Sequence, residues 1–213
     1  MRVLIASLFL LSAASLADDF LLPRAQFDNI NLTLPQSLMS AAKANISGNG
    51  NYESLSRMPE TDFLRLLSRP VGRLTILYKN GTSTCTASIV SASHILTNYH
   101  CVPGTGNHGP VEKATILMGY YSVVDTGQVK KYQVDPKPVI ADESLDIALL
   151  NVDGNPAAEW GSVSLEPRDP YPGESLLLVH HPLGHPLHVT RGHCRAYSPT
   201  SVGESDVFHT CDT

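Results

Sequence analysis

The sequence lacks basic clusters, low-complexity tracts and internal repeats. Its 15 lysine and arginine residues are scattered and its formal charge at pH 7 is −5, so no surface for nucleic acid is indicated. Beyond the N-terminus, no segment is long and apolar enough to span a bilayer. Because 42% of the residues are hydrophobic, which is ordinary for a globular protein, disorder is also disfavoured. We therefore expect a folded protein with no nucleic-acid partner.

The first 17 residues have the layout of a secretory signal peptide. Arg2 gives a positive start, residues 3–16 are mainly apolar, and Ser15 and Ala17 place small side chains before the expected cleavage site. A membrane anchor is the weaker alternative, because the apolar run is shorter than the roughly 20 residues that a bilayer requires. We expect residues 1–17 to be removed, leaving a secreted, extracellular monomer with no membrane partner.

Cysteine is scarce as well, with only 4 in the chain. An even number suits two disulfides in an oxidising compartment, although four cysteines permit three pairings. The cysteines are Cys85, Cys101, Cys194 and Cys211. Three Asn-x-Ser/Thr sequons are candidates for glycosylation, and each should lie on the surface if it is used. The sequons begin at Asn31, Asn45 and Asn80.

Residues 18–69 differ in composition from the rest of the chain. They contain no cysteine, are rich in asparagine, serine, leucine and proline, and include the flexible patch SGNGNYES. A weak helical pattern runs through ETDFLRLLSR, with Phe63, Leu64 and Leu67 on one side. These features predict an N-terminal extension or propeptide. An N-terminal arm that packs on the following domain is an equally good alternative.

From Pro70 onward, short β-type runs alternate with turn residues, which predicts an all-β domain over 70–213. Six runs precede the turn at Gly154 and about four follow it. We expect two antiparallel β-barrels, over about 70–155 and 156–213, with the second barrel incomplete. The runs of the first lobe are RLTILYK, CTASIV, HILTN, KATILMG, VKKYQV and DIALLNV. Those of the second are GSVSL, SLLLVHH, HVTRGHCRAY and DVFHT.

His100 lies directly beside Cys101, and in a chain with no metal motif it calls for an acid partner to orient it. The candidate is Asp146, in SLDIALL. A carboxylate in front of the buried run IALL is costly unless it accepts hydrogen bonds, and an imidazole N–H is a suitable donor. The other ring nitrogen of His100 would then be free to take a proton from a nucleophile. A core histidine and a carboxylate that caps a turn are the alternatives.

These motifs resemble the chymotrypsin-like serine peptidases, in their V8-like and trypsin-like-domain branch. CTASIVSASHILTNYHCV is similar to the histidine block of that family, SLDIALL to its aspartate block, and CRAYSPTSVGESDVFHTCDT to the segment that leads to the nucleophile. The resemblance covers about residues 70–213. It implies a two-barrel fold, peptide or protein substrates, no cofactor, and His100 and Asp146 as general base and orienting acid. It also implies the disulfides Cys85–Cys101 and Cys194–Cys211.

Two departures from the family pattern bear on this reading. Asn98 and Tyr99 stand where trypsins have two small residues, in the Thr-Asn-x-His form of V8-like members. No Gly-x-Ser-Gly-x-Pro loop occurs up to Thr213, and Ser205 lacks the following glycine and precedes Cys211. We expect the nucleophilic serine beyond this chain and expect the chain as written to be inactive, because the oxyanion donors would be missing too. A non-catalytic secreted homologue that acts as a binding protein is the alternative.

Five histidines crowd the segment HHPLGHPLHVTRGHC, which ends at Cys194. Histidine and cysteine are zinc ligands, but the spacing matches no HExxH or paired-finger pattern, and the prolines interrupt regular geometry. Similar HxPxG loops occur in V8-like peptidases, so we predict a structural role in the second barrel and expect no metal site. The histidines are His180, His181, His185, His188 and His193.

Overall fold

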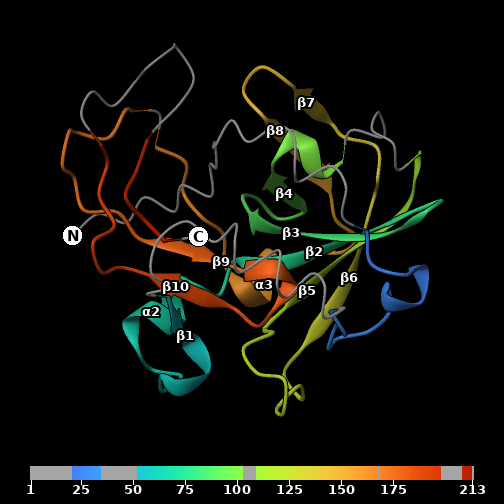
Figure 1. The fold of residues 1–213 in the computed structure, drawn as a ribbon, viewed down its shortest axis with the longest axis horizontal. Coiled ribbons are helices and arrows are strands. Elements are labelled where there is room, and N and C mark those ends of the chain that lie inside the picture. The colour runs from blue at the N-terminus through green and yellow to red at the C-terminus, as the bar shows by residue number, and fades with distance from the viewer. Residues whose placement is uncertain (1–20, 35–51, 103–108, 167, 198–207, 213) are drawn as a thin grey trace.

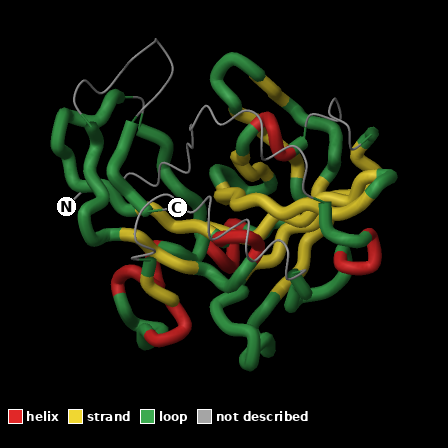
Figure 2. Tube along the Cα trace, viewed as in Figure 1, coloured by secondary structure: helices red, strands yellow, loops and turns green. Residues whose placement is uncertain are grey.

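The computed structural model describes residues 21–34, 52–102, 109–166, 168–197 and 208–212, and strands dominate its regular structure (Figures 1 and 2). The predicted signal peptide, residues 1–17, and the sequon at Asn45 lie outside the described residues. Within the part described, no helix is long and apolar enough to cross a membrane.

The first lobe is a seven-stranded antiparallel sheet in the order β6-β5-β2-β3-β4-β8-β7 (Figure 1). Its strands are β2 (Val71–Tyr78), β3 (Gly81–Ile89), β4 (His94–Thr97), β5 (Val111–Met118), β6 (Lys130–Val134), β7 (Ile140–Asp142) and β8 (Ile147–Asn151). A bridge between Val134 and Val152 joins the end of β6 to the chain after β8, so the sheet curls back on itself without closing along its whole edge. All six runs predicted for this lobe form strands, and the short β7 is additional.

Alternating residues of these strands fill the interior of the first lobe. Leu74 and Ile76 on β2 and Ile116 on β5 are fully buried. Trp160, the last residue of the short helix α3 (Ala157–Trp160), belongs to the same core. The opposite face of β2 is buried as well, although it carries the polar side chains of Arg73 and Thr75 and neighbours of similar type. A central strand with a polar outer face needs another part of the chain to cover and satisfy it.

The second lobe contains a three-stranded sheet in the order β1-β10-β9. Its strands are β1 (Glu53–Ser54), β10 (His188–Thr190) and β9 (Leu178–His180). Figure 2 shows that loops make up most of the rest of this lobe. The Cys194–Cys211 disulfide and two isolated bridges, Ser175↔Arg195 and Ala196↔His209, join these loops. The sheet is open, which agrees with the predicted incomplete second barrel.

One predicted strand of this lobe, GSVSL, is wrong. Gly161 takes a left-handed φ of 77° directly after α3, and residues 161–166 then run as an irregular segment. The Val163 N–H donates to the Ile89 carbonyl at 2.8 Å, a contact back to the first lobe. Val163 is buried although it belongs to no strand, whereas Leu165 of the same run is 60% exposed.

Two stretches of the N-terminal extension, residues 21–34 and 52–69, pack against the lobes. Leu22 exchanges two backbone hydrogen bonds with Thr82 on β3, each 2.8 Å, and β1 pairs with β10. The predicted helix is present as α2 (Phe63–Leu67), which Asp62 caps. The remaining short helices are η1 (Arg24–Gln26), η2 (Leu55–Arg57), η3 (Tyr99–Cys101) and η4 (Pro182–Gly184). These contacts are those of a packed arm, and the division of the chain at residue 69 stays a prediction.

Arg73, on the outer face of β2, joins three parts of the chain. Its Nη1 donates to the carbonyls of Ile30 and Gly184 at 2.7 and 2.9 Å, and its Nη2 donates to the carbonyl of Asn29 at 2.9 Å. The guanidinium also lies over the Tyr120 ring, 4.8 Å from its centroid. Burial lowers the pKa of Arg73 to about 10, so it remains protonated at neutral pH. One buried cation thus links the central strand, the arm of residues 21–34 and η4.

We expect Arg73→Ala to lower the free energy of unfolding by about 2–4 kcal/mol, because three carbonyls lose their donor. Lys131→Ala is the matched control, since Lys131 contacts Asp28 of the same arm at 3.2 Å but through an exposed carboxylate. An exposed pair is worth at most about 1 kcal/mol. Urea unfolding at pH 7 measures both variants, and equally small losses would contradict the role given to Arg73.

Candidate active site

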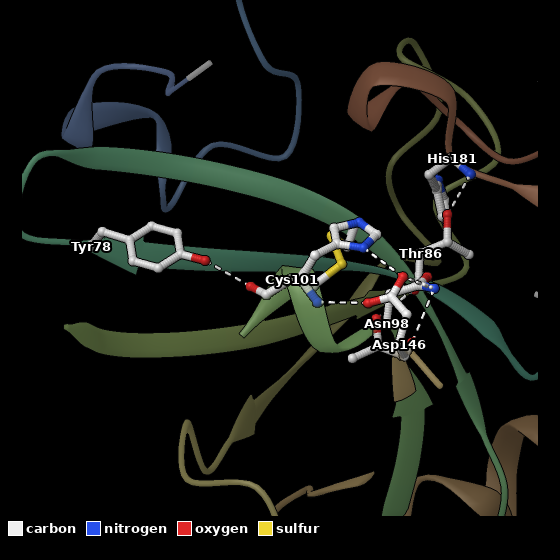
Figure 3. The surroundings of a disulfide bond; sticks show 9 residues. Tyr78, Thr86, Asn98, Cys101, Asp146 and His181 are labelled. Atoms are coloured by element: carbon white, nitrogen blue, oxygen red, sulfur yellow. Dashed lines mark hydrogen bonds and ion pairs between the residues drawn. A yellow bond between two sulfur atoms is a disulfide. The ribbon is translucent and has the colours of Figure 1, made fainter. Parts of the chain in front are cut away.

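His100 is held by its neighbours on both sides. It lies in η3, directly after β4, and the next residue, Cys101, is joined by a disulfide to Cys85 on β3. The hydroxyl of Tyr78 on β2 donates to the Cys101 carbonyl at 2.7 Å (Figure 3). Because β2, β3 and β4 are consecutive strands of one sheet, these two links fix η3 against that sheet.

Asp146 lies directly before β8, the strand that pairs with β4. Thr97, the last residue of β4, pairs with Ala148 on β8, so the segment after β4 faces the turn before β8. Asp146 ends that turn with a left-handed φ of 49°, an unusual conformation for a residue other than glycine. The register of the β4–β8 pair therefore brings together two residues that lie 46 positions apart in the sequence.

The Asp146 carboxylate accepts three hydrogen bonds from the segment after β4. The His100 backbone N–H donates to Oδ1 at 2.9 Å, and the His100 Nδ1 lies 2.8 Å from Oδ2. The Asn98 amide nitrogen Nδ2 also donates to Oδ2, at 3.0 Å, and Figure 3 shows Asn98 and Asp146 side by side. Because an ionised carboxylate only accepts, this geometry predicts the His100 tautomer with the proton on Nδ1.

This arrangement leaves the second ring nitrogen of His100 available for chemistry. The His100 side chain is 50% exposed, whereas that of Asp146 is 12% exposed. With Nδ1 protonated, Nε2 of the neutral ring carries a lone pair, and it receives no hydrogen bond from the described residues. A nitrogen of this kind can accept a proton from a hydroxyl or a water molecule and return it in a later step.

No serine of the described residues is bonded to His100, and Ser205 lies outside them. A different serine–histidine pair does occur, because the Ser91 hydroxyl lies 2.7 Å from Nδ1 of His94 in the turn between β3 and β4. Among the described residues, no carboxylate pairs with His94. We interpret this contact as part of the turn, since the two residues are three apart in sequence and both are partly buried.

The histidine-rich segment has contacts of a structural kind. Cys194 is bonded to Cys211, and Nδ1 of His181 donates to the His185 carbonyl at 2.8 Å. In the described part of the chain, the one group with three clustered donor atoms suited to a metal is Cys85, His100 and Cys101. Its two sulfur atoms are already joined to each other, and a disulfide lacks the thiolates that bind zinc.

The two described sequons differ in their surroundings. Asn80 lies at the exposed turn between β2 and β3. Asn31 is exposed too, but its Nδ2 donates to the Val123 carbonyl at 2.8 Å and its Oδ1 accepts from the Tyr120 hydroxyl at 3.0 Å. Attachment of a glycan to Nδ2 of Asn31 would therefore disturb the hydrogen bonds by which this amide binds the N-terminal arm to the first lobe.

Several residues of the site were not found from the sequence. The Tyr78 hydroxyl on β2 donates to the carbonyl of Cys101, the residue after His100. On β3, Thr86 Oγ1 accepts from the backbone N–H of His181 at 3.0 Å. The sequence distinguishes Asn98 only as a departure from the trypsin pattern. The signal for its role was the Thr-Asn-x-His order, which places an amide two residues before the histidine.

A family model described as "Trypsin-like peptidase domain" matches residues 85–213. Among solved structures, Deg5 is 16% identical with a TM-score of 0.52, covering 70% of this chain and 73% of that one. The active form of the Rv3671c protease from M. tuberculosis is 18% identical with a TM-score of 0.47, covering 62% and 50%. A Glu endopeptidase is 17% identical with a TM-score of 0.47, covering 63% and 60%.

The likeness to Deg5 shows the fold and nothing of the activity. The chain spans about half the length of two Rv3671c structures, 50% of one in the active form and 52% of one in the inactive form. No curated protein sequence matches the chain.

Two histidines beside the site are buried in their neutral form. Burial lowers the pKa of His180 to about 4 and that of His181 to about 3, and nearby positive charge adds to the effect, from His188 in the first case and from Arg73 in the second. Tyr120 stacks on His181 at 6.1 Å between ring centroids, and Tyr52 meets His180 edge-on. Because each folded pKa is depressed, the unfolded chain takes up these protons first as the pH falls through 6.5.

We therefore expect the free energy of unfolding to fall between pH 6.5 and 5, by up to about 1.4 kcal/mol per pH unit for each of these histidines. Carboxylates ordinarily titrate below this window. His181→Asn keeps a donor near the Nδ1 position but removes the titration, so its slope should be smaller by up to about 1.4 kcal/mol per pH unit. Urea unfolding at several pH values gives both slopes, and identical slopes would rule out a neutral, buried His181.

Proposed function

Because the chain belongs to the trypsin-like peptidase domain family, we propose that the protein is a secreted serine endopeptidase, with His100 as general base and Asp146 as the acid that orients it. The observation that carries this proposal is the set of three hydrogen bonds on the Asp146 carboxylate, two of which come from His100. A histidine that only fills the core is not expected to bond one ring nitrogen to a buried carboxylate and leave half of its side chain exposed. The substrates proposed are peptides or proteins.

In the proposed mechanism, Nε2 of His100 takes the proton of a serine hydroxyl as that oxygen attacks the peptide carbonyl. The imidazolium then gives the same proton to the leaving amine. Asp146 stays ionised throughout, holding Nδ1 protonated and stabilising the positive ring. The short contact between Nδ1 and Oδ2, 2.8 Å, and the second contact from the backbone N–H suit this role.

The serine itself has to come from outside the 213 residues in this proposal. No Gly-x-Ser-Gly-x-Pro motif occurs in the sequence, and the exposed side of His100 has no bonded hydroxyl among the described residues. A loop of this kind would also supply the backbone N–H groups that stabilise the oxyanion, usually the largest single contribution to catalysis. Without it, the 213 residues alone should be inactive.

Secretion is part of the proposal and has two independent supports. The first 17 residues have the layout of a signal peptide. The chain also forms two disulfides, Cys85–Cys101 and Cys194–Cys211, and has no free cysteine among the described residues. Disulfides of this kind persist in oxidising compartments.

A non-catalytic homologue that binds other proteins is the competing function. The retained contact between His100 and Asp146 favours the enzyme, because a binding protein has no use for an oriented proton acceptor. Reading the coding sequence past codon 213 separates the two. A Gly-x-Ser-Gly-x-Pro loop supports the enzyme, and a loop with the serine replaced supports the binding protein.

The chemical test uses the protein carrying its natural continuation. We expect it to react with a fluorophosphonate probe and to cleave peptides, and we expect His100→Ala to reduce kcat/KM by about 10⁴-fold or more, because removing the base leaves only binding and the oxyanion donors. Asp146→Asn should be similarly severe, since an amide stabilises the wrong tautomer of the ring.

Two controls accompany this test. His94→Ala removes the other partly exposed histidine of the same sheet and should leave turnover near the wild-type value, because His94 pairs with a serine and with no carboxylate in the described structure. The 213-residue chain should not be labelled by the probe. Wild-type turnover in the His100→Ala protein would overturn the proposed function.

A further inference from the structure

The Asn98 side chain makes two contacts, and both are with Asp146. Its Nδ2 donates to the carboxylate oxygen Oδ2 at 3.0 Å and to the backbone carbonyl of the same residue at 3.3 Å. Both groups are buried, with residue exposures of 5% for Asn98 and 8% for Asp146. One amide therefore bonds to both the backbone carbonyl and the carboxylate of Asp146 in a largely buried place.

The backbone of Asp146 explains why such a tie is needed. A residue other than glycine at φ 49° occupies a conformation that is disfavoured by steric contact with its own Cβ, and it persists when surrounding contacts hold it. The Asp146 N–H donates to the Glu143 carbonyl at 3.3 Å, which closes the turn on one side. The hydrogen bond from Asn98 to the Asp146 carbonyl closes it on the other side.

We propose that Asn98 is a positioning residue, which acts through its amide N–H groups to hold the Asp146 carboxylate against Nδ1 of His100. This inference rests on the proposed function and extends it to a third side chain. Asn98 is suited to the task because it directly follows β4, whose pairing with β8 brings it close to Asp146. Its backbone carbonyl also accepts from the Cys101 N–H at 3.2 Å. The same residue thus anchors both the helix that carries His100 and the acid that orients it.

A purely steric role for Asn98 makes a different prediction. If Asn98 only filled space, Asn98→Leu would be tolerated, because the two side chains have the same number and branching of heavy atoms. If the amide donor matters, Asn98→Leu should be as damaging as Asn98→Ala, because both variants remove the donor and neither adds a charge beside Asp146. The pair of variants therefore separates donation from packing.

The first readout is solvent exchange of the His100 Nδ1 proton, followed by NMR on the 213-residue chain at neutral pH. We expect Asn98→Ala and Asn98→Leu to raise the exchange rate by about tenfold to a hundredfold, the range for losing a hydrogen bond to a charged group. Asn151→Ala is the control, because Asn151 is an exposed asparagine at the far end of β8, and its exchange rate should match the wild type.

The second readout is the division between kcat and KM in the protein with its natural continuation. A residue that positions the acid should lower kcat in both Asn98 variants by about tenfold to a hundredfold, with KM unchanged, since substrate does not contact it. Wild-type exchange and kcat in Asn98→Leu would overturn the inference. If the exchange rates change as expected while every form of the protein lacks activity, the positioning role stands and the proposed function fails.

Discussion

The carboxylate of Asp146 has to find hydrogen-bond donors inside the protein, and the arrangement of the site depends on that requirement. A carboxylate removed from water costs several kcal/mol unless its oxygens are satisfied. Here the donors come from Asn98 and His100, in the segment that follows β4. Because β4 pairs with β8, the backbone register of the two strands places the segment that carries the donors opposite the turn that carries the acceptor. The geometry needed to orient His100 is thus a consequence of strand pairing.

A second buried charge connects the lobes on the same principle. Arg73 is satisfied by carbonyls from the N-terminal arm and from η4, two segments that the sequence separates widely from β2. At η4, Gly184 has a φ of 75°, and a Cβ there would lie 2.8 Å from side-chain atoms of both Leu32 and Thr84. The arm, the first lobe and the turn of the second lobe therefore meet closely around one guanidinium. An extension that supplies two of the three acceptors of a buried cation is part of the folded structure.

The sequence predicts those features that local pattern determines. The six strands of the first lobe follow from β-type runs between turn residues, and His100 and Asp146 follow from motifs that each occupy a few positions. GSVSL has the same kind of pattern but forms no strand, and its Val163 N–H donates to the Ile89 carbonyl at 2.8 Å. The acceptors of Arg73 and the amide of Asn98 could not be predicted either, since both depend on which distant backbone groups the fold brings near.

The tautomer of His100 tests the account most directly. A neutral imidazole free in water favours the proton on Nε2, whereas a carboxylate facing Nδ1 holds the proton there. The ¹⁵N chemical shifts of the His100 ring in the 213-residue chain, at a pH where the ring is neutral, distinguish the two forms. We predict a protonated Nδ1 and an unprotonated Nε2, reverting toward the Nε2–H form in Asp146→Ala. A wild-type ring protonated at Nε2 would contradict the account, because that nitrogen could then accept no proton from a nucleophile.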